Sequence, residues 1–218
     1  MRYQDAVQRL QAAFAGSLPG HDGLLPMTGY PRPGLEAVRR MQPAPRESAV
    51  LAMVYPRHMQ AHVLLMLRPD YDGVHSGQVG FPGGRREPGD ADLLHTAVRE
   101  FNEETGASTS PMQHLGSLTP VYIPPSNSLV TPFVAAVDEP GAFSPDPREV
   151  AALIEAPLSL LLGDETLRMG GRHVHVLGRV LEVPYFDVKG HMVWGATALI
   201  IAELRAMLNG RSPAGSGR

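Results

Sequence analysis

The sequence predicts an α/β fold in which helices cover a mixed β-sheet. Short apolar runs, bounded by Pro, Gly and polar residues, recur along the chain and are typical of buried strands. Two other segments, residues 92–105 and 195–210, repeat apolar side chains at helical spacing. With 218 residues, of which 43% are hydrophobic, the chain is long enough to bury one core. Several strands with one central and one terminal helix favour a layered architecture.

The first half of the chain predicts a helix, a wrapping segment and a hairpin. Residues 3–14 carry apolar residues at helical spacing, and Gly and Pro follow them directly. The Pro- and Gly-rich stretch that completes residues 1–47 is expected to wrap around the folded body, with one short helix at 35–40. Residues 48–56 and 61–69 are apolar runs joined by polar turn residues, which predicts a hairpin of buried strands.

The second half predicts further strands and two helical segments around them. Residues 114–123 and 129–138 are expected to form strands, because both are apolar runs and a turn-forming "PPSNS" joins them. Residues 148–163 are expected to contain a short helix, and residues 172–188 to form two strands. Residues 195–210 then close the fold as a helix that ends at a glycine.

These elements predict one domain with two extensions. We expect residues 48–209 to form the domain, residues 1–47 to add the N-terminal helix and the wrapping segment, and residues 210–218 to be a disordered tail. The N-terminal residues lack the apolar block of a signal peptide, and no apolar run reaches the ~18 residues of a membrane span. We therefore expect a cytoplasmic protein.

Charge and cysteine content exclude several classes of function. The net charge is −3 and the pI is near 6.3, which leaves no basic surface for nucleic acid or an anionic membrane. Cysteine is absent, so disulfides, thiolate zinc sites and a cysteine nucleophile are excluded. The remaining candidates are enzymes or binding modules for small molecules.

The central helix carries three crowded carboxylates. At 100° per residue, Glu100, Glu103 and Glu104 fall on neighbouring positions of the helix predicted at residues 92–105. Like charges at this spacing cost roughly 0.2–0.5 kcal/mol per pair, and the helix macrodipole also disfavours anions near the C-terminal end. One explanation is a solvated acidic face in which Arg99 offsets part of the repulsion. The other is a bound hard divalent cation such as Mg²⁺.

A glycine pair before this helix favours the second explanation. Gly83 and Gly84 precede a charged loop, where glycine allows a sharp turn and close approach of a ligand. The stretch "GGRREPGDADLLHTAVREFNEETGA", residues 83–107, resembles the Nudix box. Asp90 takes the place of the first acidic residue of that box, but eight residues separate it from Arg99, one more than usual. The longer loop and the upstream run "HSGQVGFPGG" resemble the coenzyme A pyrophosphatase branch of the Nudix family.

The resemblance implies a fold, a reaction and a cofactor. The fold would be a Nudix-type α/β/α sandwich with a mixed β-sheet between helices. The reaction would be metal-dependent hydrolysis of a nucleoside diphosphate derivative, with Mg²⁺ or Mn²⁺ as cofactor. Coenzyme A would be cleaved to 3′,5′-ADP and 4′-phosphopantetheine. Two alternatives stay open. The first is a Nudix hydrolase that acts on ADP-ribose or a dinucleotide, and the second is a non-catalytic module that senses nucleotides. A homodimer is a further expectation from the family.

The resemblance also implies roles for the acidic residues. Glu103 and Glu104 would be metal ligands, and Glu100 either a ligand or the base for the attacking water. Arg99 would orient these carboxylates through charge-assisted hydrogen bonds. Glu149 is the candidate for a further ligand from outside the box, although an acid stabilised by the first turn of a helix explains it equally well.

The loop residues before the helix are candidates for substrate binding. His75 and Gln78 could contact coenzyme A or hydrogen-bond within their own loop. The two arginines of the charged loop could bind phosphates, although solvated loop cations are common. The substrate-binding candidates are His75, Gln78, Gly83, Gly84, Arg85 and Arg86.

Overall fold

The computed structural model describes the chain apart from residues 22–23, 25–26, 28–30, 74, 175–176 and 211–218. All but the first residue of the tail predicted at 210–218 therefore lies outside the described residues. The helices are α1 (Tyr3–Phe14), α2 (Leu35–Arg39), α3 (Leu93–Thr105), α4 (Leu158–Leu162) and α5 (Gly195–Leu208). The strands are β1 (Arg46–Arg57), β2 (Gln60–Leu67), β3 (Val79–Gly80), β4 (Gly83–Arg85), β5 (Gln113–Ser117), β6 (Val121–Ile123), β7 (Ser128–Ala136), β8 (Ala152–Pro157), β9 (Leu167–Val174), β10 (Arg179–Val188) and β11 (His191–Trp194).

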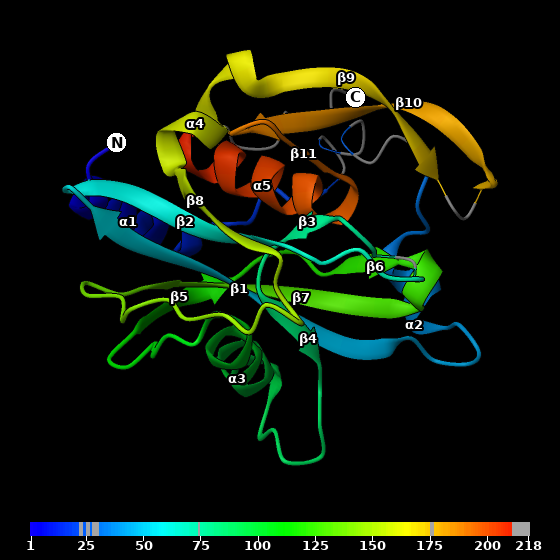
Figure 1. Ribbon diagram of the computed structural model, residues 1–218, viewed down its shortest axis with the longest axis horizontal. Coiled ribbons are helices and arrows are strands. Elements are labelled where there is room, and N and C mark those ends of the chain that lie inside the picture. Colours follow the sequence, from blue (N-terminus) through cyan, green and yellow to red (C-terminus); the bar gives the residue numbers. More distant parts are fainter. Residues whose placement is uncertain (22–23, 25–26, 28–30, 74, 175–176, 211–218) are drawn as a thin grey trace.

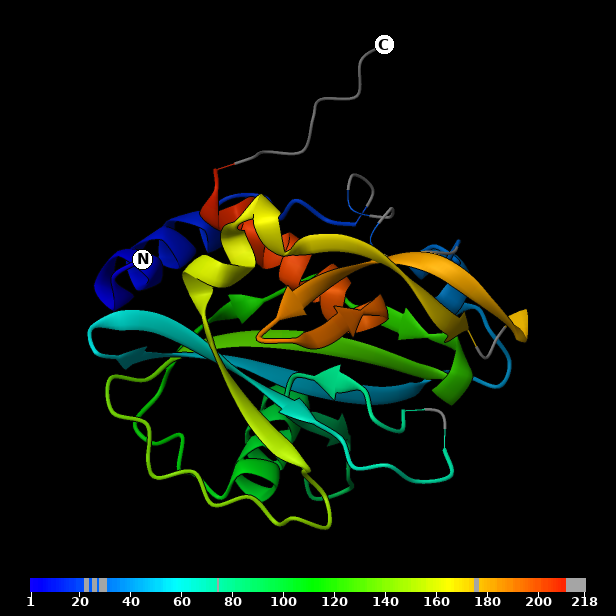
Figure 2. The ribbon, with the colours of Figure 1, turned by 45° about the horizontal axis from the view of Figure 1, so that its top comes forward.

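A mixed sheet lies between two layers of helices, so the predicted α/β/α sandwich is confirmed (Figures 1 and 2). The strand order is β3-β2-β1-β7-β5, with β8 on β2, β4 on β1 and β6 on β7. β1 runs parallel to β7 and antiparallel to β2 and β4. Helix α3 packs on one face of the sheet, whereas α1 and α5 cover the other. No helix in the described part of the chain is both long and apolar enough for a membrane crossing.

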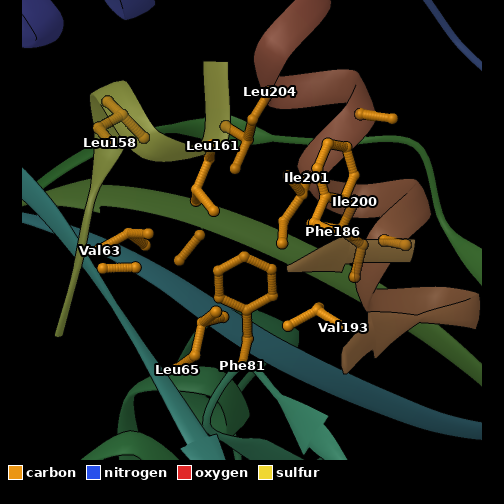
Figure 3. Packing of buried hydrophobic residues seen from close by; sticks show 14 of the residues in the cluster. Val63, Leu65, Phe81, Leu158, Leu161, Phe186, Val193, Ile200, Ile201 and Leu204 are labelled. Carbon is orange, nitrogen blue, oxygen red and sulfur yellow. The ribbon is translucent and has the colours of Figure 1, made fainter. Parts of the chain in front are cut away.

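Strand β1 is buried on both faces, which explains its nearly continuous apolar sequence. Ala52 and Val54 belong to the core under α5, and the alternating residues Leu51 and Met53 belong to the core under α3. Figure 3 shows the larger core, where side chains of the sheet meet those of α4 and α5. The predicted hairpin is confirmed, since β1 and β2 pair directly around a tight turn.

The short helix expected within residues 148–163 is confirmed only in the last part of that stretch. Residues 152–157 form β8, which pairs antiparallel with β2, and only Leu158–Leu162 are helical. Ile154 and Ala156 alternate into the larger core, as a strand requires. Pro157 has no backbone N–H to donate within a helix, so the helix begins only after it. Residues 152–157 therefore form a strand because they pair with the free edge of β2, although their local sequence pattern is helical.

The second of the two strands expected within residues 172–188 is confirmed as β10, whereas β9 begins earlier than expected, at Leu167, and ends at Val174; residues 175–176 lie outside the described residues. Strand β11 was missed, and the three strands form a separate antiparallel sheet beside α5 (Figure 2). The short β11 leads directly into α5, so this second sheet places the start of that helix near β3 and β6.

Candidate active site

Local capping fixes the position of the carboxylate helix α3. The Asp92 side chain accepts a hydrogen bond from the His95 N–H at 2.8 Å, as predicted for an N-cap residue. Gly106 ends the helix in the left-handed conformation with φ of 67°. Ala97 and Phe101 are completely buried in the core between α3 and the sheet. Glu100 and Glu104 lie beside this buried stripe, on the flank of the helix that faces β4.

The glycine pair of β4 allows these carboxylates to approach the backbone closely. A Cβ atom at Gly84 would lie 2.4 Å from the carboxyl carbon of Glu100. Gly83 has a φ of 153°, and a Cβ there would lie 2.3 Å from the Ala49 carbonyl oxygen. The Gly83 N–H donates to Glu104 Oε2 at 2.7 Å. Gly84 thus leaves space for the Glu100 carboxylate against β4, whereas Gly83 allows β4 to pair closely with β1.

The loop between β4 and α3 folds around one buried carboxylate, that of Asp90. Asp90 accepts hydrogen bonds from the Glu87 N–H and the Thr96 hydroxyl, both at 2.9 Å. The Arg99 guanidinium adds a bidentate contact at 3.0 and 3.1 Å. The Arg99 hydrogen bonds, followed by the Glu87 N–H, hold the pKa of the Asp90 carboxyl well below its usual range. Asp90 is therefore a structural anchor for the loop.

Arg99 connects this anchor to the other acidic residues. Its Nη1 atom lies 3.0 Å from Glu100 Oε1 and also donates to Glu103 Oε2 at 3.0 Å. Its Nη2 atom donates to the Arg85 carbonyl oxygen at 3.0 Å. The guanidinium thus restrains two carboxylates of α3 and also contacts Arg85 and Asp90 at the loop.

Glu100 and Glu104 are electrostatically costly in their positions. Burial raises the pKa of Glu104 to about 7, although Arg68 and the Gly83 N–H act in the opposite direction. Burial also raises the pKa of Glu100, against the lowering effect of Arg99. The charge of Glu100 further disfavours ionisation of Glu104. A positive charge placed between the two carboxylates would remove this cost.

A cavity of about 350 Å³ opens above these carboxylates. It lies between the sheet and the start of α5, and residues of β1, β3, β4 and β7 contribute to its wall. Among the predicted site residues, those that line it are His75, Gln78, Gly83, Gly84, Arg85, Glu100 and Glu104. The structure therefore brings the upstream run and two box carboxylates to one cavity.

The other predicted residues lie outside its wall. The Glu103 side chain is 57% exposed and pairs with Arg99. Arg86 pairs with Glu47 at 3.0 Å. Glu149 lies exposed in a turn rather than in the first turn of a helix, yet its charge contributes to the raised pKa of Glu104.

Among the cavity residues that the sequence analysis did not single out are two arginines, Arg68 and Arg32. Arg68 Nη2 lies 3.6 Å from Glu104 Oε1 and donates to the Gly83 carbonyl oxygen at 3.3 Å. The signal for Arg68 was a single cation at the end of the apolar strand β2. Arg32 lies in the Pro- and Gly-rich segment, where no pattern marked it.

Comparisons with known proteins place this site in a family. The family model described as NUDIX domain matches residues 45–175. Mitochondrial coenzyme A diphosphatase NUDT8 of Homo sapiens is 36% identical, over 75% of this chain and 70% of that protein. Uncharacterized Nudix hydrolase NudL of Yersinia enterocolitica is 36% identical, over 67% of this chain and 74% of that protein. The solved NUDIX domain of Shewanella oneidensis NrtR, complexed with ADP ribose, covers 81% of this chain and 99% of its own at a TM-score of 0.46 and 17% identity.

The chain belongs to the Nudix family, so the resemblance recognised in the sequence is confirmed. It is a Nudix hydrolase, an enzyme that acts on diphosphates. Nudix hydrolases generally use divalent metal ions.

The donor set of the cavity fits such an ion. Among the described residues, no three His, Cys, Asp or Glu side chains are gathered into a preformed cluster. Mg²⁺, however, keeps several waters and commonly binds through one or two carboxylates together with substrate phosphates. Glu100 and Glu104 supply two such carboxylates at the cavity wall. Their raised pKa values show that each lacks full compensation of its charge within the protein.

Substitution of Gly84 by Ala should displace Glu100 without unfolding the protein. The added Cβ meets the far end of a flexible side chain, so the chain can relax while the carboxylate moves. We expect the hydrolysis rate to fall at least about 10-fold and the free energy of unfolding to change by less than about 1 kcal/mol. The control is Gly89→Ala in the same loop, where a Cβ meets nothing within 4 Å. Equal rates for the two variants would contradict the close approach of Glu100 to β4.

Glu104 should make the metal-free protein less stable as the pH rises. Its folded-state pKa is about 7, above the usual 4.5, so the folded state binds the extra proton between these values. The contribution of Glu104 to stability is then fully present below pH 4.5 and is lost as the pH rises through 7, by on the order of 3 kcal/mol. Glu104→Gln, which keeps an oxygen for the Gly83 N–H, should remove this slope. Denaturant unfolding in chelator at several pH values measures it, and parallel curves for the two proteins would refute the assignment.

Proposed function

We propose that this Nudix hydrolase is a metal-dependent coenzyme A diphosphatase, which cleaves the diphosphate of coenzyme A or an acyl derivative. The products are 3′,5′-ADP and 4′-phosphopantetheine. The observation that carries the proposal is the common cavity, in which His75 and Gln78 of the upstream run lie with Glu100 and Glu104 of the box. The run resembles the coenzyme A branch, and a relative with 36% identity carries the name of coenzyme A diphosphatase.

Mg²⁺ or Mn²⁺ is the proposed cofactor. Glu100 and Glu104 would hold it from the cavity wall, with Glu103 and Glu149 as candidates for further ligands from its edge. When bound, such an ion neutralises diphosphate charge and lowers the pKa of bound water. Arg99 restrains Glu100 and Glu103 and thereby keeps their oxygens oriented in a fixed direction.

The remaining residues of the cavity bind and orient the substrate. The cations Arg68 and Arg85 lie in the wall beside the carboxylates, where a diphosphate would contact them. Arg86 stays a candidate for a phosphate contact at the entrance of the loop. Glu100, whose pKa is raised by burial, can accept the proton of an attacking water when it is not a metal ligand. His75 and Gln78 line the same cavity and hydrogen-bond to each other at 3.5 Å, and Gly83 and Gly84 bring the β4 backbone close to the carboxylates.

Three further expectations belong to this proposal. The partner is a small nucleotide, and the cytoplasm is the proposed location. A homodimer stays a prediction from the family.

Substrate profiling tests the proposed function. The protein is incubated with Mg²⁺ or Mn²⁺ and with coenzyme A, ADP-ribose, a dinucleotide or a nucleoside triphosphate, and the products are identified by mass. We expect the highest kcat/KM for coenzyme A, with release of 3′,5′-ADP. A preference for ADP-ribose or a dinucleotide would replace coenzyme A as the substrate, and binding without any turnover would favour the sensing module.

A further inference from the structure

Arg32 extends from the N-terminal wrapping segment into the wall of the substrate cavity. Its Nη1 atom donates to the Tyr122 carbonyl oxygen on β6 at 2.6 Å. Its Nη2 atom lies close to Gly195 at the start of α5, since a Cβ built there would be 3.8 Å away. The guanidinium is therefore bound to β6 and lies beside the start of α5, and the segment that carries it is otherwise without an assigned function.

Arg32 lies at the opposite end of the cavity from the catalytic carboxylates. Pairing across the sheet runs from Arg85 on β4 to Ser48, then to Val130, then to Val121 on β6. Three strand steps of about 4.8 Å separate β4 from β6 by about 14 Å. Arg32 is thus placed to contact a part of the substrate other than a phosphate held at Glu100 and Glu104.

The surroundings of Arg32 suit the nucleoside end of a substrate. Ile123 on β6 and Trp194 just before α5 line the cavity, as do Val130 and Ile200, and they offer apolar and aromatic surface to a base; the Arg172 guanidinium lies over the Trp194 ring at 5.6 Å. A guanidinium within such surroundings binds a phosphate strongly, because its donors match two phosphate oxygens and the apolar wall reduces competition from water. This end of the cavity can therefore hold a base and one additional phosphate next to it.

We propose that Arg32 binds the 3′-phosphate of coenzyme A. The inference rests on the proposed function, because coenzyme A carries a phosphate monoester on the ribose, one sugar away from the diphosphate. ADP-ribose and simple dinucleotides have a hydroxyl at that position. Arg32 would then be a specificity-determining residue, and the N-terminal segment would contribute directly to substrate choice.

The test compares coenzyme A with dephospho-coenzyme A, which differs only in the 3′-phosphate. For Arg32→Ala, we expect kcat/KM for coenzyme A to fall about 10- to 100-fold, as for loss of a charged hydrogen-bonded pair. The value for dephospho-coenzyme A should change less than about 2-fold, and Arg32→Lys should restore part of the loss. Arg40→Ala, an exposed cation of the same segment, is the matched control and should leave both values unchanged.

A binding measurement without added metal separates this inference from the proposed function. Calorimetry with 3′,5′-ADP and 5′-AMP should show that Arg32→Ala weakens binding of 3′,5′-ADP alone. Equal losses for both ligands, or for both substrates, would mean that Arg32 only anchors the segment and would overturn the inference. Failure of the wild-type protein to hydrolyse coenzyme A or dephospho-coenzyme A would contradict the proposed function. Unchanged binding of 3′,5′-ADP by Arg32→Ala would contradict the contact between Arg32 and the 3′-phosphate, whatever the hydrolysis assay shows.

Discussion

The close approach of two buried carboxylates to a glycine strand is the constraint on which this site depends. Glu100 and Glu104 lie one helical turn apart and both face β4, so their charges repel each other in surroundings that hydrate them poorly. The fold supplies only partial compensation, through Arg68, Arg99 and the Gly83 N–H. Two buried carboxylates whose charges are only partly compensated form a site that suits a divalent cation, together with the substrate phosphates that commonly bind such a cation.

The rest of the architecture maintains that approach. Asp90 fixes the loop between β4 and α3, and Arg99 links the loop to the helix face. Strand β1 pairs with β2 through residues 54–57 and with β4 through residues 48–50. The second pairing places the β1 and β4 backbones in the cavity wall beside the carboxylates. The second sheet and α5 close the cavity from above, and the N-terminal segment completes it with a cation at the far end.

The sequence predicted the features that local patterns determine, such as the central helix and the fold class. It missed features that depend on residues distant in the chain. Helix α3 follows from the spacing of its apolar residues, and the fold class follows from alternating elements. Residues 152–157 have a helical pattern but form a strand, because the free edge of β2 is visible only in the folded chain. Arg32 and Arg68 were missed for the same reason, since their importance comes from the cavity that they enter. Glu103 and Glu104 are adjacent in sequence, yet only the packing of α3 shows that one is exposed and the other buried.

Binding of Mn²⁺ tests the central claim most directly. A titration followed by the electron paramagnetic resonance of free Mn²⁺ compares the wild-type protein with Glu100→Gln and Glu104→Gln, with the exposed Glu139→Gln as control. If a divalent cation compensates the buried carboxylates, each of the two site variants should bind Mn²⁺ at least about 10-fold more weakly while remaining folded, and the control should match the wild type. Wild-type affinity in both site variants would contradict the account.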